Sequence, residues 1–117
     1  MSRPVALLVV LFLACDDDCK APEGLDLTGL WGTQACGASD ACDIEQNGSR
    51  LSVECRYTGA TCTGSVCGDR EIQLACESRN GSAYECTGTV SQDGDTVSGT
   101  CTGPIVCSAT FRRVGEP

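Results

Sequence analysis

The sequence predicts an all-β fold: a small disulfide-rich antiparallel meander of about eight strands, closed as a barrel or flattened into a sandwich. Three observations predict this fold. Apolar and polar residues alternate with a period of two through most of the chain after residue 27, which is typical of half-buried strands. Asn-Gly and Asp-Gly pairs separate these runs at short intervals, as tight hairpins require. Eleven cysteines in 117 residues indicate a disulfide scaffold formed in an oxidising compartment.

The first 14 residues have the composition of a secretory signal peptide. Arg3 supplies its charged region, Val5 to Leu13 its apolar region, and Ala14 the small residue before the cleavage point. The apolar run is too short to span a membrane, which takes about 20 residues. We therefore divide the chain into a signal peptide (1–14), a lipidated tether (15–26) and a disulfide-rich β domain (27–117).

The lipid on the tether is expected from the residues around the cleavage point. Phe12-Leu13-Ala14-Cys15 resembles the lipobox of bacterial lipoprotein precursors, in which the cysteine receives a diacylglycerol thioether and becomes the mature N-terminus. The resemblance implies that Cys15 is the lipid attachment site. It also implies a protein anchored in a bacterial cell envelope, facing the periplasm or the cell surface. The alternative is an ordinary signal peptide that leaves Cys15 as a thiol.

The first two strands of the domain are expected at residues 28–34 and 41–46. A third follows at 50–57, where Leu51, Val53, Cys55 and Tyr57 alternate with polar residues. Asn47-Gly48 lies before it and supplies the positive φ of a tight turn.

Five further strands complete the predicted meander. They are expected at residues 60–67, 71–77, 84–91, 96–102 and 105–112. Asn80-Gly81 and Asp93-Gly94 form turns between them. In the last strand Cys107, Ala109 and Phe111 are expected to face inward.

The cysteines are expected to hold this fold together. Leucine, isoleucine, valine and phenylalanine make up only 15 of the 103 residues after Ala14, fewer than a packed core of this size normally uses. Each disulfide typically adds ~2–4 kcal/mol. Without Cys15 an even number remains: Cys19, Cys36, Cys42, Cys55, Cys62, Cys67, Cys76, Cys86, Cys101 and Cys107.

Spacing alone does not determine how these cysteines pair. Hairpin register suggests several pairs, some of which exclude one another. They are Cys42 with Cys55, Cys76 with Cys86, Cys86 with Cys101, and Cys101 with Cys107.

The residues that most catalytic sites need are missing from the sequence. The chain has no histidine and no Cys-x-x-Cys pair, so the usual nucleophile, zinc and thioredoxin-type motifs are absent. Asp93 and Asp95 are interpreted as turn residues, and the run from Asp16 to Asp18 as a solvated charge run, although either set offers calcium-type ligands. We expect a protein that is not an enzyme and that carries no metal or cofactor.

One short segment suggests a family comparison. Leu27-Thr28-Gly29-Leu30-Trp31 resembles the start of the first strand in lipocalins and avidins, two families of eight-stranded meander barrels. The resemblance implies that Trp31 is structural and plugs the closed end of the barrel. The avidin biotin site needs further tryptophans, and this chain has one.

The interior of the barrel is expected to be pinched rather than hollow. Its inward positions include Gly64, Gly88, Gly99 and Ala109, which let the walls approach each other. A small-molecule ligand is therefore not expected, and a sizeable apolar cavity would reverse this judgement.

Three functions remain open, and a net charge of −8 argues against nucleic acid as a partner in any of them. The first is a structural or interaction module of the envelope, with a possible envelope protein as its partner. The second is an inhibitor of an envelope-attacking enzyme such as lysozyme, because Tyr84-Glu85-Cys86 resembles the Tyr-x-Cys element of small lipid-anchored inhibitors. The third is a lipocalin-like binder of small ligands.

Overall fold

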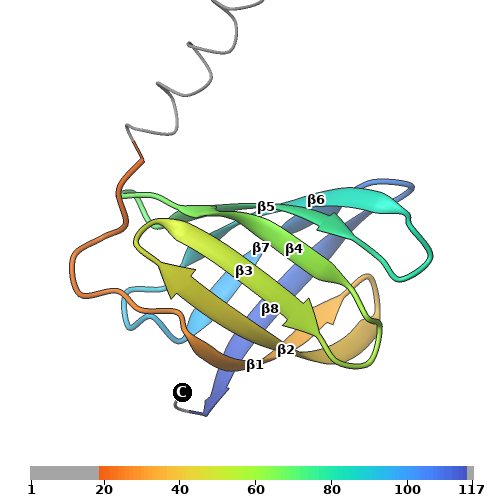
Figure 1. The fold of residues 1–117 in the computed structure, drawn as a ribbon, viewed down its shortest axis with the longest axis horizontal. Helices are drawn as coiled ribbons and strands as arrows, with labels where there is room; N and C mark the ends of the chain where they lie inside the picture. Colours follow the sequence, from red (N-terminus) through yellow and green to blue (C-terminus); the bar gives the residue numbers. More distant parts are fainter. Residues whose placement is uncertain (1–18, 116–117) are drawn as a thin grey trace, which may run out of the picture.

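Eight strands form close to where the alternation predicts them, and each pairs antiparallel with its neighbours (Figure 1). The computed structural model describes residues 19–115. The meander closes because β1 pairs with β8, for example Thr33 opposite Phe111, so the fold is a barrel and not a sandwich. The strands are β1 (Gly29–Ala35), β2 (Ala38–Asn47), β3 (Arg50–Cys55), β4 (Thr61–Val66), β5 (Glu71–Glu77), β6 (Ala83–Val90), β7 (Thr96–Thr102) and β8 (Val106–Gly115).

The chain turns where glycine or a polar side chain permits it. Gly48, Gly81 and Gly94 all have positive φ, as expected for the three turns that contain them. The prediction that Tyr57 extends the inward face of β3 is wrong, because β3 ends at Cys55 and Tyr57 is 73% exposed. The Asp40 carboxylate accepts the N–H of Tyr57 and bends the chain there.

The two ends of the barrel differ, and we name them by their turns. The closed end carries the turns after β2, β4 and β6, together with residues 19–28. The open end carries the turns after β1, β3, β5 and β7. In the described part of the chain, no helix is long and apolar enough to cross a membrane.

The half of the barrel near the closed end is filled with large side chains. Burying each Val, Leu or Ile side chain stabilises the fold by roughly 1.5–3 kcal/mol. The free space in this part of the interior is about 20 Å³, room for no more than about one water molecule. The main contributors are Leu27, Trp31, Ile44, Leu51, Val66, Ile72, Leu74, Val90 and Val97.

Glycines bring the strands close together at mid-barrel, as the sequence predicts. A Cβ on Gly99 would lie 1.9 Å from the carbonyl oxygen of Thr87 and 2.6 Å from the Cα of Gly88. Gly88, Gly99 and Ala109 all border the small interior space described above. The expected pinching is therefore confirmed for this part of the interior.

Ten cysteines form five disulfides, and two of the suggested pairs are among them: Cys42–Cys55 and Cys86–Cys101. The suggestion of Cys76 with Cys86 is wrong, because the turn after β5 is longer than expected and places Cys76 opposite Tyr84. Cys101 does lie opposite Cys107, but these residues bond to Cys86 and Cys36 instead. The remaining bonds are Cys19–Cys67, Cys36–Cys107 and Cys62–Cys76.

Candidate functional site

The open end of the barrel contains a cavity of about 420 Å³, which we call the cup. Every strand contributes to its wall, and most of the wall is apolar. The prediction of a pinched interior is therefore wrong for this half of the barrel. The lining residues are Thr33, Ala35, Cys36, Ala38, Asp40, Cys42, Val53, Cys55, Thr58, Ala60, Cys62, Cys76, Ser78, Ser82, Tyr84, Cys86, Cys101, Thr102, Pro104, Ile105 and Phe111.

The cup exists because the inward residues become smaller towards the open end. Along β2, for example, the inward side chains change from Ile44 near the closed end to Cys42 at the level of the cup. Ala35 and Ala60 likewise occupy positions where a larger side chain would fill the space. Cysteine packs as a small hydrophobe, so the wall stays apolar without filling the interior.

Four disulfides surround the cup and complete what we call the disulfide ring. At the open end, turns join β1 to β2, β3 to β4, β5 to β6 and β7 to β8. Disulfides bridge the alternate seams: Cys42–Cys55 (β2 to β3), Cys62–Cys76 (β4 to β5), Cys86–Cys101 (β6 to β7), and Cys36–Cys107 (end of β1 to β8).

Each strand is consequently linked to one neighbour by a turn and to the other by a disulfide, so the rim is covalently continuous. The strands cannot separate at the mouth, and the cup keeps its shape when it is empty. Such pre-organisation reduces the entropy that a ligand loses on binding.

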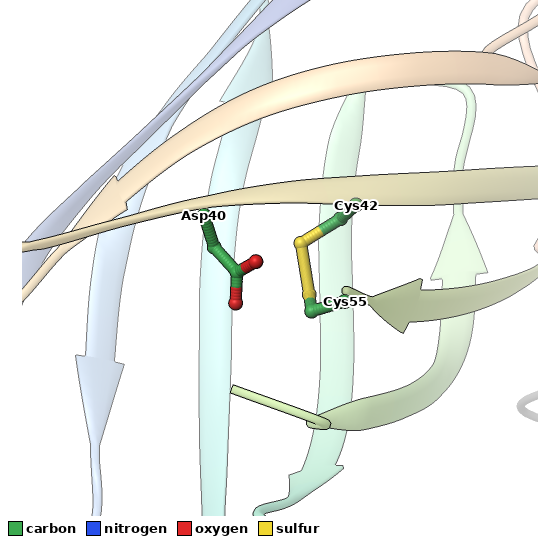
Figure 2. A group of neighbouring side chains, drawn as sticks. All are labelled: Asp40, Cys42 and Cys55. Atoms are coloured by element: carbon green, nitrogen blue, oxygen red, sulfur yellow. A yellow bond between two sulfur atoms is a disulfide. The ribbon is translucent and has the colours of Figure 1, made fainter. Parts of the chain in front are cut away.

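One carboxylate, Asp40 of β2, lies in the wall of the cup (Figure 2). Its Oδ1 accepts the N–H groups of Ala41 at 2.7 Å and Tyr57 at 2.9 Å. Its Oδ2 accepts the N–H of Thr58 at 3.1 Å and the hydroxyl of Thr58 at 2.6 Å. Burial raises the pKa of Asp40, but these hydrogen bonds outweigh it and hold the pKa below its ordinary value. Asp40 is therefore ionised at neutral pH.

Asp40 also lies beside the sulfurs of Cys42 and Cys55, as Figure 2 shows. The three residues have the types and the proximity of a metal site. The two sulfurs are bonded to each other, however, and a disulfide offers no thiolate to a metal. The residues do not fit a metal ion while this disulfide is intact.

Tyr84 of β6 lies in the opposite wall, four strands away from β2 around the barrel. Its side chain is half-buried and packs against the core. Burial raises the pKa of the Tyr84 phenol, and the negative charge of Asp40 raises it further. The neutral phenol and the Asp40 carboxylate thus face the same space. Of the Tyr84-Glu85-Cys86 element, Tyr84 and Cys86 line the cup, whereas Glu85 is exposed.

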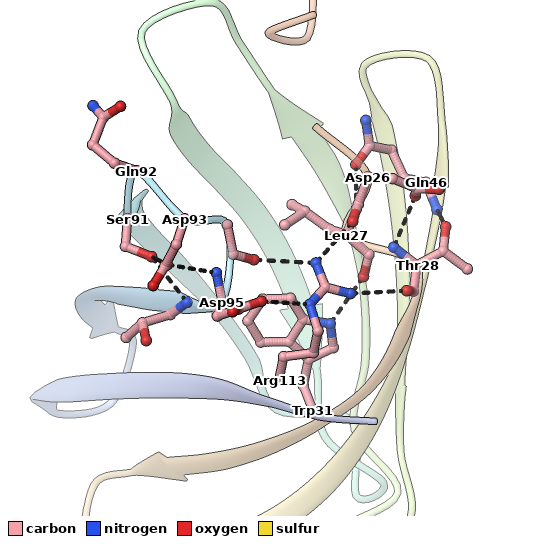
Figure 3. A network of polar contacts seen from close by, with 12 residues as sticks. Asp26, Leu27, Thr28, Trp31, Gln46, Ser91, Gln92, Asp93, Asp95 and Arg113 are labelled. Atoms are coloured by element: carbon pink, nitrogen blue, oxygen red, sulfur yellow. Dashed lines mark hydrogen bonds and ion pairs between the residues drawn. The ribbon is translucent and has the colours of Figure 1, made fainter. Parts of the chain in front are cut away.

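Trp31 lies near the closed end, away from the cup, beside a polar network that centres on Arg113 (Figure 3). Its side chain is fully buried and its Nε1 donates to the carbonyl oxygen of Leu27 at 2.9 Å. The guanidinium of Arg113 lies over its ring. These contacts hold Trp31 in the closed half of the barrel.

The two aspartates of the turn after β6 are held by bonds within this network (Figure 3). Asp93 accepts the N–H of Asp95 at 3.0 Å, and hydrogen bonds with the Ser91 hydroxyl lower the pKa of Asp93. Asp95 forms an ion pair with Arg113 at 3.0 Å. The Asp93 carboxylate thus holds the turn together, whereas the Asp95 carboxylate links the turn to β8.

A wider hollow of about 1180 Å³ lies outside the barrel along β2, β3 and β4. Most of its lining residues are polar by type, such as Glu45, Asn47 and Ser65, so its wall is mixed in character, in contrast to the mostly apolar wall of the cup. The expected lipid attachment site, Cys15, lies outside the described residues, as do the predicted signal peptide and the acidic run 16–18.

Sequence reasoning missed the two most connected charged residues, Asp40 and Arg113. Asp40, Cys42 and Ile44 are alternate residues of β2 and therefore share one face of the strand. The sequence signal for Asp40 is thus a carboxylate on an otherwise apolar face. Arg113 lies one residue beyond the expected end of the last strand, and no local pattern marks it.

Comparison of the chain with protein-family models, curated proteins and solved structures finds no match.

Proposed function

We propose that this protein is a lipid-anchored protein of the bacterial cell envelope whose barrel binds a small, largely apolar molecule in the cup. The observation that carries the proposal is the apolar cavity of about 420 Å³ at the open end. Sites for small ligands are concave, mostly apolar and largely pre-formed, with volumes of ≈ 300–1,000 Å³. The cup has all of these properties, and the disulfide ring pre-forms it.

The anchoring part of the proposal rests on the lipobox-like residues around Cys15. Four residues later, Cys19 is bonded to Cys67 in the turn after β4, at the closed end. A chain anchored through Cys15 would therefore hold the barrel by its closed end. This arrangement favours a mouth that points away from the membrane and is open to ligand.

Ligand binding is tested with the uncharged, polarity-sensitive dye Nile red on the oxidised protein, Cys19 included. The dye is expected to bind one site and to gain fluorescence. Ala35→Phe, which fills the cup, is expected to weaken binding by about tenfold or more. Ala75→Phe makes the same change on the outer face of β5, where Ala75 is exposed, and is expected to leave binding unchanged. Absence of dye binding, or equal binding by both variants, would refute the proposal.

Native mass spectrometry of the protein purified from its membrane tests the natural ligand and the anchor together. We expect a retained small molecule, and acyl chains on Cys15 in the mature protein. The variant Cys15→Ser should lose the acyl mass and the membrane association while it keeps Nile red binding. An unacylated Cys15 in the membrane-extracted protein would refute the anchoring part of the proposal. Ligand binding would then still be decided by the Nile red experiment.

A further inference from the structure

The cup carries a charge of one sign only. Asp40 is the single acidic residue among its described lining residues, and no lysine or arginine lines it. A ligand in the cup therefore meets one negative charge fixed in the wall. The guanidinium of Arg79 lies nearby, against Gly59 in the loop after β3, but it is not among the described lining residues and forms no ion pair with Asp40.

The four hydrogen bonds to Asp40 fix this charge in place. They come from neutral donors of the backbone and of Thr58, so they stabilise the carboxylate without removing its net charge. They also occupy both oxygens. Asp40 therefore acts on a ligand mainly through its electric field, which is stronger beside an apolar wall than in bulk water.

Tyr84 completes the opposite side of the mouth. An aromatic ring attracts cations through its negative face, and this attraction adds to that of a nearby carboxylate. Tyr84 and Asp40 line the same cavity; burial raises the pKa of the Tyr84 phenol, and the charge of Asp40 raises it further.

Building on the proposed function, we propose that the cup selects amphiphiles with a cationic head, placing an ammonium group at the mouth between Asp40 and Tyr84 and the apolar body among the disulfides. An uncharged head forgoes this attraction, and a carboxylate head is repelled by Asp40. The ligand class is therefore an amine with an apolar body, and not a fatty acid.

The test uses three probes with the same alkyl chain: decylamine, decanol and decanoate. Each is tested for displacement of Nile red from the oxidised protein at neutral pH and low salt. The expected order of affinity is amine, then alcohol, then carboxylate, with about tenfold or more between the amine and the carboxylate. If the amine binds no more tightly than the alcohol, or the carboxylate binds as tightly as the alcohol, the selectivity is refuted.

Variants that change one charge inside or outside the cup test whether the selectivity arises in the cup. Asp40→Asn is expected to bring the three affinities together, whereas Glu85→Gln removes an equal charge from the outer face of β6 and should preserve their order. Because Asp40→Asn also alters the loop after β3, Ala38→Lys offers a second route: Ala38 is an exposed residue of the rim, and the added cation should favour decanoate. Unchanged ratios in both variants would contradict the inference.

Failure of this inference is distinguishable from failure of the proposed function. If decanol displaces Nile red but the heads are not discriminated, the cup binds ligands without charge selectivity. If neither decanol nor Nile red binds, the proposed function itself fails.

Discussion

The guanidinium carbon of Arg113 lies 4.8 Å from the centroid of the Trp31 ring, and this contact joins the two ends of the meander. Trp31 belongs to β1 and Arg113 to β8. The same guanidinium donates to the carbonyl oxygens of Asp26, Thr28 and Gly94 at 2.8, 3.2 and 3.1 Å. One side chain thus connects the segment before β1, the turn after β6 and the last strand.

Replacing Arg113 should destabilise the closed end strongly. Arg113→Ala removes a cation–π contact and several charge-assisted hydrogen bonds, so we expect a loss of about 3 kcal/mol in the free energy of unfolding. Arg113→Lys should recover only part of it, because an ammonium cannot reproduce the planar fork of donors. Urea unfolding under oxidising conditions measures both values.

The neighbouring Arg112 provides a matched control for this prediction. Its side chain is exposed, and Arg112→Ala should change stability by less than about 0.5 kcal/mol. Equal effects at the two positions would show that the contacts of Arg113 contribute nothing beyond its charge.

The disulfides of the ring should differ in how much they stabilise the barrel. Cys36–Cys107 closes a loop with a sequence separation of 71, and Cys42–Cys55 closes one of 13. The entropy that a cross-link removes from the unfolded chain grows with the logarithm of loop length, which gives a difference of about 1.5 kcal/mol. The double variant Cys36→Ser/Cys107→Ser should therefore lose more stability than Cys42→Ser/Cys55→Ser.

Denaturant unfolding of the two double variants, with the other disulfides verified by peptide mapping, checks this order. The first variant also breaks the link between β1 and β8, the seam that no turn spans. A larger loss for Cys42→Ser/Cys55→Ser would mean that local packing, and not loop entropy, dominates the contribution of these bonds.

The strands could be predicted from the sequence because each depends on local information. In β3, Leu51, Val53 and Cys55 alternate with polar residues, which determines the face that is buried. Asn47-Gly48 determines the turn before this strand. Pairs that face each other across a short hairpin, such as Cys42 and Cys55, follow from the same local register.

Barrel closure and the cup depend on contacts between distant residues. The pairing of β1 with β8, and with it Cys36–Cys107, has no local signature. The inward residues predict the cup only when the height of each residue in the barrel is known. Sorted by height in the barrel, small residues such as Ala35 gather at the open end, while large ones such as Leu74 lie deeper.

Adding one methyl group to Gly99 should disrupt the narrow part of the barrel. Its Cβ would lie 1.9 Å from a backbone oxygen of the neighbouring strand, and a strand cannot shift as a flexible side chain can. We expect Gly99→Ala to cost about 3 kcal/mol or more, or to prevent folding. Thermal unfolding measures the loss.

Gly37→Ala is the comparison for this variant. Gly37 has a positive φ in the turn after β1, but an added Cβ would meet no atom within 4 Å. Strain at such a turn costs about 1 kcal/mol, so this variant should fold and be clearly more stable than Gly99→Ala. A mild effect of Gly99→Ala would show that β6 and β7 separate more easily than their close approach implies.

Asp40 should make the open end sensitive to acid. Its folded pKa lies below the ordinary value of 3.8, so the unfolded chain binds more protons than the folded chain in this range. The stabilisation is therefore complete above about pH 4, and is lost as the pH falls through the folded pKa. Asp40→Asn should be less stable than the parent at neutral pH, and the difference should shrink as the carboxyl group becomes protonated.

This dependence is tested by measuring the free energy of unfolding from neutral pH down to a pH below the folded pKa of Asp40. Asp69→Asn serves as the control, because Asp69 accepts one backbone N–H, that of Glu71, in the turn after β4. Asp69→Asn should therefore cost much less stability than Asp40→Asn does. The bonds to Asp40 hold the loop after β3, whose Thr58 and Ala60 line the cup, so the Nile red affinity of the parent should fall over the same pH range. A stability difference between parent and Asp40→Asn that persists below the folded pKa would mean that shape, and not the ionised carboxylate, makes Asp40 necessary.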